Sequence, residues 1–287
     1  MLFPGPLSIS SHFKFQQPMV QPHPPFEPLP FLRNGHAQTV AASFFFPGKS
    51  FPYQARQHRV VLEDGDALIL HDDRPESWRD GDRVALVVHG LAGCHGSPYA
   101  QRIAAKLHAV GIRVFRMDMR GCGAGIGLAK LPYHAGRSQD VAAALQEIAQ
   151  VCLGSPATAV SYSLGANITL KLLGECGENS PGELDSAVAV SPPIDLLGCV
   201  ERLRRPGNWM YDRYFVKLLW EQIAQRERQS PDVPTVAWPR RPRRLVEIDD
   251  WYTAPLSGFE SAEDYYRRCA SNQFLSGIRL PTLILTA

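Results

Sequence analysis

The protein is a chain of 287 residues, of which 45% are hydrophobic and 20% charged, with a formal net charge of +2. This is the composition of an ordinary soluble globular protein, long enough for one large domain with an insertion. So small a net charge gives no reason to expect nucleic acid as a partner. No apolar run reaches the length of a transmembrane segment, and the amino terminus lacks the pattern of a signal peptide. We therefore expect a cytoplasmic protein.

The cysteines indicate neither a metal site nor a disulfide framework. The sequence has six of them and no Cys-x-x-Cys pair, a pattern that favours free thiols in a reducing compartment. We therefore expect no metal ion. The six are Cys94, Cys122, Cys152, Cys176, Cys199 and Cys269.

The chain begins with a proline-rich segment at residues 1–30, which we predict to be extended or disordered. Residues 31–287 are predicted to form one α/β domain, beginning with a turn that leads into a short helix. Next, two strands at residues 57–63 and 67–71 flank Asp64-Gly65-Asp66, a sequence typical of a hairpin turn. This hairpin would form an antiparallel edge of a sheet.

Strands and helices alternate through most of the remaining chain, which predicts a mostly parallel sheet covered by helices on both faces. The predicted strands are residues 83–89, 112–117, 157–162, 186–190 and 280–286, and the predicted helices are residues 97–110, 138–152 and 164–176. The segment at about 195–254, here called the cap, breaks the alternation with an amphipathic stretch at 211–228. We predict that the cap is a helical insertion over the carboxyl ends of the strands, where such sheets bind ligands.

Ser163 lies between the predicted strand 157–162 and the predicted helix 164–176, with small residues at Ser161 and Gly165 on either side. This pattern predicts a nucleophile elbow, a sharp turn that presents the serine hydroxyl. The helix behind the turn offers N–H groups and a positive dipole end to a developing oxyanion. The common form of the motif has glycine where this chain has Ser161. Ser163 is therefore the candidate nucleophile.

The segment His89-Gly90-Leu91-Ala92-Gly93 follows a buried strand and precedes a helix. In a serine hydrolase of this build such a loop supplies the second oxyanion donor. We predict that the backbone N–H groups of Leu91 and Leu164 form the oxyanion hole. His89, Gly90 and Gly165 are predicted to support the loops, because glycine lets two backbones approach closely.

With these motifs the chain resembles the YheT-like (embryogenesis-associated, ABHD-type) branch of the α/β-hydrolases, from about residue 34 to the end. The resemblance implies a carboxylester hydrolase with a Ser-Asp-His triad, acting on short acyl esters or glycerolipid esters without a cofactor. The matching motifs are Asn34-Gly-His-Ala-Gln-Thr39, His89-Gly-Leu-Ala-Gly93, Ser97-Pro-Tyr99, Arg120-Gly-Cys-Gly123, Tyr133-His134, Tyr162-Ser-Leu-Gly165 with Asn167, Asp249-Asp250 through Thr253-Ala-Pro255, Gly258-Phe259 and Asp264-Tyr-Tyr266.

The family pattern places its acid after the strand that resembles residues 280–286, and its histidine after one more strand. Ala287 is the last residue of the sequence, and all nine histidines precede Ser163. Losing the base of a triad costs about a million-fold in rate, so we expect this sequence to be a truncated form of a longer enzyme. Asp195 stands where some α/β-hydrolases carry a substitute acid, but the family pattern does not use it. The alternatives are a non-catalytic relative that binds a small apolar ligand, and an acyltransferase.

Three further features of the sequence indicate a function less specifically. The basic run Arg240-Arg-Pro-Arg-Arg244 could contact anionic lipid head groups but is more typical of a solvated loop. Asp249 and Asp250 could form a metal pair, although hydrogen bonding within the fold is the better interpretation. His134 is predicted to order the loop beside the elbow.

Overall fold

The computed structural model describes residues 27–31, 33–44, 55–230 and 232–286. Contacts divide the chain into two units, residues 1–47 and 48–287. The described part of the first unit holds one helix, α1 (Gly35–Phe44), at the place where a short helix was predicted. Of the predicted proline-rich terminus, residues 1–26 lie outside the described residues.

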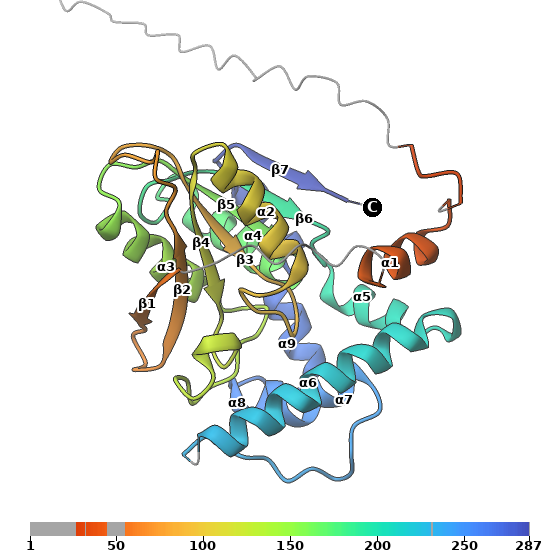
Figure 1. Ribbon diagram of the computed structural model, residues 1–287. Helices are drawn as coiled ribbons and strands as arrows, with labels where there is room; N and C mark the ends of the chain where they lie inside the picture. Colours follow the sequence, from red (N-terminus) through yellow and green to blue (C-terminus); the bar gives the residue numbers. More distant parts are fainter. Residues whose placement is uncertain (1–26, 32, 45–54, 231, 287) are drawn as a thin grey trace, which may run out of the picture. The chain divides into compact units, whose positions relative to one another are not determined.

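The second unit is built on a seven-stranded sheet of order β1-β2-β4-β3-β5-β6-β7 (Figure 1). The hairpin β1–β2 is antiparallel and so is the β2–β4 pair, whereas the other four pairs are parallel. The predicted α/β fold with an antiparallel hairpin at its edge is therefore confirmed. The strands are β1 (Arg56–Val61), β2 (Ala67–Asp73), β3 (Val84–Val88), β4 (Arg113–Asp118), β5 (Ala157–Tyr162), β6 (Leu184–Val190) and β7 (Thr282–Leu285).

Helices cover both faces of this sheet because the side chains of a strand alternate between its faces. On β3, Val87 packs with Ala100 and Ala104 of α2 (Pro98–Ala109). Its neighbours Leu86 and Val88 belong to the larger cluster on the opposite face, with residues of α3 (Ser138–Val151) and α4 (Leu164–Cys176). Both β3 neighbours are fully buried, which places the core on the two sides of the central strands.

The cap is helical, as its pattern predicted, and α6, α7 and α8 lie together at one side of the sheet (Figure 1). No helix among the described residues combines the length and the apolar composition that a membrane crossing requires. The elements after β6 are α5 (Leu196–Leu203), the 3₁₀ turn η2 (Pro206–Asn208), α6 (Trp209–Gln229), α7 (Leu245–Ile248), the π-helical turn η3 (Asp249–Thr253), α8 (Ala254–Leu256) and α9 (Ala262–Cys269), followed by the 3₁₀ turns η4 (Ser271–Gln273) and η5 (Leu275–Gly277) and by β7.

The prediction of free thiols agrees with the structure, in which all six cysteines are free. In the basic run, Arg240 pairs with Glu247 at 2.7 Å, and the other three arginines are exposed. The interpretation of this run as a solvated loop stays a prediction.

Candidate active site

Ser163 forms a sharp turn between β5 and α4. Its φ of 48° and ψ of −118° lie outside the regions that residues with a side chain normally adopt. Hydrogen bonds hold the turn, because the Ser163 N–H donates to the Val190 carbonyl at 2.8 Å and the Ser163 carbonyl accepts from the Asn167 N–H at 3.0 Å. The residue is nevertheless exposed. A strained backbone thus presents an accessible hydroxyl at the end of β5.

Small residues on both sides allow this turn. A Cβ atom on Gly165 would lie 2.3 Å from the His89 carbonyl oxygen, and one on Gly90 would lie 3.1 Å from the Ser163 Cβ. Ser161, the departure from the common glycine, is completely buried, and its hydroxyl lies 2.7 Å from the Thr169 hydroxyl. The chain therefore accommodates the extra hydroxymethyl group by giving its oxygen a hydrogen-bond partner.

The loop after β3 has most of its N–H groups engaged. Gly90 donates to the Tyr99 hydroxyl and Ala92 to the Tyr133 hydroxyl, both at 2.8 Å, and Gly93 donates to the Gly90 carbonyl at 3.1 Å. In the described part of the chain, the N–H groups of Leu91 and Leu164 donate to no protein acceptor. Two backbone donors without protein partners in this part of the chain thus remain, one in the loop after β3 and one at the start of α4.

His89 lies beneath this loop and is buried. Its Nδ1 is 2.7 Å from the Gly90 carbonyl, and its Nε2 accepts a hydrogen bond from the Met119 N–H at 3.2 Å. The proton therefore sits on Nδ1, which donates to the carbonyl. Burial lowers the pKa of His89 below its usual value, which keeps the ring neutral. This arrangement is consistent with the prediction that His89 supports the loop after β3.

Leu91 and Leu164, whose N–H groups have no protein acceptor among the described residues, line one pocket, and Ser163 lines another. The other residues that line the pocket of Leu91 and Leu164 include Leu219 and Arg226 of α6 and Tyr252 of η3. Ser163 lines a more open recess of about 1080 Å³, together with Ser191 and Thr286. No histidine is among the described residues that line this recess. Asp195 also borders it, but its carboxylate accepts from the Gly198 N–H at 3.0 Å and caps α5.

The titratable groups at the pocket are held by protein partners. His134 Nδ1 accepts from the Gly136 N–H at 3.1 Å, and burial holds its pKa well below the usual value. Asp249 accepts from the Tyr266 hydroxyl at 2.5 Å and the Thr253 hydroxyl at 2.9 Å, and burial raises its pKa to about 6. Asp250 accepts from the Ala262 N–H at 3.0 Å. The acid pair is therefore engaged in hydrogen bonds, as its sequence interpretation expected.

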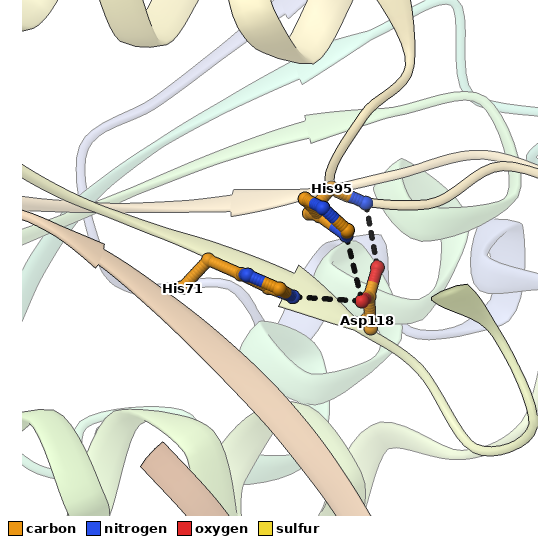
Figure 2. Close-up of side chains that lie close together, drawn as sticks. All are labelled: His71, His95 and Asp118. Atoms are coloured by element: carbon orange, nitrogen blue, oxygen red, sulfur yellow. Dashed lines mark hydrogen bonds and ion pairs between the residues drawn. The ribbon is translucent and has the colours of Figure 1, made fainter. Parts of the chain in front are cut away.

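One cluster of potential metal ligands was not predicted. His71 Nε2 and His95 Nδ1 both lie 2.8 Å from Asp118 Oδ2, and the two imidazole rings stack with centroids 3.6 Å apart (Figure 2). One ligand atom from each residue lies within 4.8 Å of the others, and two imidazoles with a carboxylate are a donor set that zinc or iron accepts.

Hydrogen bonding already accounts for the geometry of this cluster. Besides the two rings, Asp118 accepts from the His95 N–H at 2.6 Å and from the Ala124 N–H at 2.8 Å. Both rings direct a nitrogen at the same oxygen rather than at a common point between the three residues (Figure 2). We therefore interpret Asp118 as a buried anchor that ties the loop after β3 to the loop after β4.

Comparisons with known proteins agree with this architecture. A family model described as "Serine aminopeptidase, S33" matches residues 80–246. The chain is 32% identical to "Putative esterase YheT" of Escherichia coli (strain K12), covering 91% of this chain and 76% of that protein. It is 26% identical to "Embryogenesis-associated protein EMB8" of Picea glauca, covering 92% and 60%, and 24% identical to "Phospholipase ABHD3" of Mus musculus, covering 82% and 58%.

This chain thus spans about three-fifths of the Picea glauca and Mus musculus proteins. Among solved structures, that of DcsB in complex with its substrate analogue matches with a TM-score of 0.51 at 12% identity, covering 81% of this chain and 80% of that one, which supports the fold alone. The family model covers more than half of the chain, and the Escherichia coli relative matches nearly all of it. The chain therefore belongs to the YheT-like, embryogenesis-associated family of α/β-hydrolases, a family of esterase and lipase type.

Proposed function

We propose that this protein is a serine hydrolase that cleaves carboxylic esters through an acyl-enzyme on Ser163. The observation that carries the proposal is the combination of an exposed hydroxyl on a strained turn with two backbone donors, Leu91 and Leu164, that have no protein acceptor. Such donors stabilise the oxyanion of a tetrahedral intermediate, usually the largest single contribution to acyl transfer. No cofactor is needed for this chemistry.

In the proposed mechanism, Ser163 Oγ attacks the ester carbonyl carbon. The carbonyl oxygen becomes an oxyanion that accepts from the N–H groups of Leu91 and Leu164. Collapse of the intermediate releases the alcohol and leaves the acyl group on Ser163, and water then hydrolyses this acyl-enzyme. The hydroxyl proton passes to a base. The family pattern places its acid and histidine after the strand that corresponds to β7, and Thr286, the residue directly after β7, lines the recess of Ser163.

The substrate class follows from the pocket and the relatives. Apolar side chains line much of the pocket, including Leu219, Ile223 and Tyr252 from the cap. The relatives are named as an esterase, a phospholipase and, in Saccharomyces cerevisiae, a monoacylglycerol lipase. We propose short acyl esters or glycerolipid esters as substrates, which makes the partner a small molecule, including lipid-like ones.

The test is to detect the acyl-enzyme directly. We expect p-nitrophenyl butanoate to acylate the protein, with the butanoyl group on the peptide that contains Ser163 when the reaction is quenched and analysed by mass spectrometry. The corresponding p-nitroanilide should leave no adduct, because an amide is a poorer acylating agent. Release of p-nitrophenol without an adduct on Ser163 would contradict the mechanism, and binding without release would favour a non-catalytic relative. Ethanol that outcompetes water for the acyl group would identify an acyltransferase.

Tyr133 offers a test of the oxyanion loop. Its hydroxyl accepts the Ala92 N–H at 2.8 Å and lies 3.2 Å from Gln222 Oε1 of the cap. Removing one oxyanion donor costs about 10²–10³ in rate, so Tyr133→Phe, which only loosens the loop, should lower the acylation rate about tenfold. The release of p-nitrophenol followed over time measures this rate. The exposed Tyr214→Phe is the matched control and should change nothing; equal rates for the two variants would show that the loop needs no such anchor.

A further inference from the structure

Arg226 of α6 is a buried cation that lines the same pocket as Leu91 and Leu164. Only 3% of the residue is exposed. Its guanidinium donates to the Tyr252 hydroxyl and to the Lys130 carbonyl oxygen, two uncharged partners. Its Nε is buried without any hydrogen-bond partner, and no carboxylate of the described residues forms an ion pair with it.

The other charged groups at this pocket are already partnered. The Arg120 guanidinium donates to the carboxylates of Asp140, Asp66 and Asp64, all at 2.6–2.8 Å. The Asp249 carboxylate is held by two hydroxyl donors, and burial disfavours its charged form. Among the described residues that line the pocket, Arg226 is therefore the cation that has no anionic partner of its own.

A buried charge without a counter-ion is unfavourable, because the protein interior replaces the solvation that the charge loses. An anionic ligand would remove this cost. The guanidinium also suits such a ligand, since its planar set of donors matches a carboxylate or a phosphate. A Cβ atom on the neighbouring Gly121 would lie 3.2 Å from Arg226 Cδ and 3.6 Å from its Nε, so the glycine leaves space beside this part of the side chain.

We propose that Arg226 binds an anionic group of the substrate, so that the preferred esters carry a carboxylate or a phosphate apart from the bond that is cleaved. That the ligand is an ester rests on the proposed function as an ester hydrolase. In such a complex the ester carbonyl lies at the Leu91 and Leu164 donors, and the anionic group lies at the cap side of the pocket.

Binding to a Ser163→Ala variant tests this, because the readout does not depend on turnover. Isothermal titration calorimetry would compare 1-butanoylglycerol with 1-butanoylglycerol 3-phosphate, and methyl pentanoate with monomethyl glutarate. Each pair differs by one anionic group. We expect the anionic member of at least one pair to bind about tenfold more tightly or better, as expected for a charged hydrogen bond. The pair that shows the preference distinguishes a phosphate from a carboxylate, and equal affinities within both pairs would overturn the proposal.

Variants of Arg226 separate recognition from folding. In the same background, Arg226→Met should abolish the preference while the neutral ligand still binds. Arg226→Lys keeps the charge without the planar fork and should retain part of the preference. The control is Arg228→Met, an exposed arginine on the same helix, which should leave the preference unchanged. An undiminished preference in Arg226→Met and Arg226→Lys would show that another group binds the anion. Equal affinities within both ligand pairs in the parent protein would overturn the proposal even if these variants failed to fold. Anionic binding together with absent hydrolysis would leave this site standing and remove only the proposed ester chemistry.

Discussion

Replacing Ser163 with alanine should abolish the covalent adduct that a fluorophosphonate forms with this protein. The reagent needs an accessible hydroxyl beside oxyanion donors, and Ser163 is exposed and directly precedes Leu164, whose N–H has no protein acceptor in the described part of the chain. Intact-mass and peptide mass spectrometry measure the adduct. Ser191→Ala is a matched control, because Ser191 is also exposed, also has a φ of 48° and lines the same recess. An adduct that survives in Ser163→Ala, or that is lost in Ser191→Ala, would show that Ser163 is not the nucleophile.

The rate of labelling by the fluorophosphonate shows whether a base takes the proton of the Ser163 hydroxyl. Losing the base of a triad costs about a million-fold, and no histidine lines the described recess around Ser163. We therefore expect slow labelling of the 287-residue chain that accelerates when imidazole is added, since the recess of about 1080 Å³ is large enough to admit it. Rapid labelling that imidazole does not change would mean that a group of this chain already acts as the base.

The strand-turn-helix around Ser163 could be predicted from the sequence because its signals are local. Small residues around Ser163 and apolar residues at helical spacing after it placed a strand at 157–162 and a helix at 164–176, and these are the bounds of β5 and α4. The free donor at Leu91 could only be suggested by motif. That its neighbours Gly90 and Ala92 are engaged depends on two tyrosines, nine and 41 residues further along the chain.

Other parts of the site depend on tertiary contacts that no spacing in the sequence reveals. His71 and Asp118 are 47 residues apart and meet because β2 pairs with β4 in an antiparallel register. Arg226 resembles any other basic residue on an amphipathic helix until its burial is known. Asp195 follows a strand as a substitute acid would, yet its carboxylate is used as the N-cap of α5. In each case the residue type was visible but its partner was not.

Asp118→Asn should strongly destabilise the fold. The carboxylate accepts four hydrogen bonds, from both imidazoles and from two backbone N–H groups, and is completely buried. An asparagine keeps one acceptor oxygen and turns an NH₂ group toward these donors. Disrupting a buried, charged hydrogen-bonding network of this kind costs about 3–5 kcal/mol of unfolding free energy, which urea denaturation would measure. Asp185→Asn, which breaks the exposed pair with Arg83, should cost about 1 kcal/mol or less.

The shifted pKa of Asp118 predicts how its contribution to the unfolding free energy changes with pH. Burial tends to raise the pKa of Asp118, but hydrogen bonds from His71 and His95 outweigh it and hold the pKa well below its usual range. A depressed pKa means that the stabilisation is fully present above about pH 4, the unfolded value, and is lost as the pH falls below it. The difference in stability between wild type and Asp118→Asn should therefore shrink below about pH 4. A constant difference down to pH 2 would show that the charge of Asp118 contributes nothing.

The same variant distinguishes a hydrogen-bonded anchor from a metal centre. A metal ion that binds only the folded state raises stability by an amount that grows with the logarithm of its free concentration above the dissociation constant. Because both imidazole nitrogens already lie within hydrogen-bond distance of Asp118 Oδ2, zinc would have to displace these contacts before it could bind. We expect the melting temperature of the wild type to be the same with zinc and with a chelator, and Asp118→Asn to lower it equally in both. A rise with zinc that Asp118→Asn removes would instead establish a metal site between β2, the loop after β3 and the end of β4.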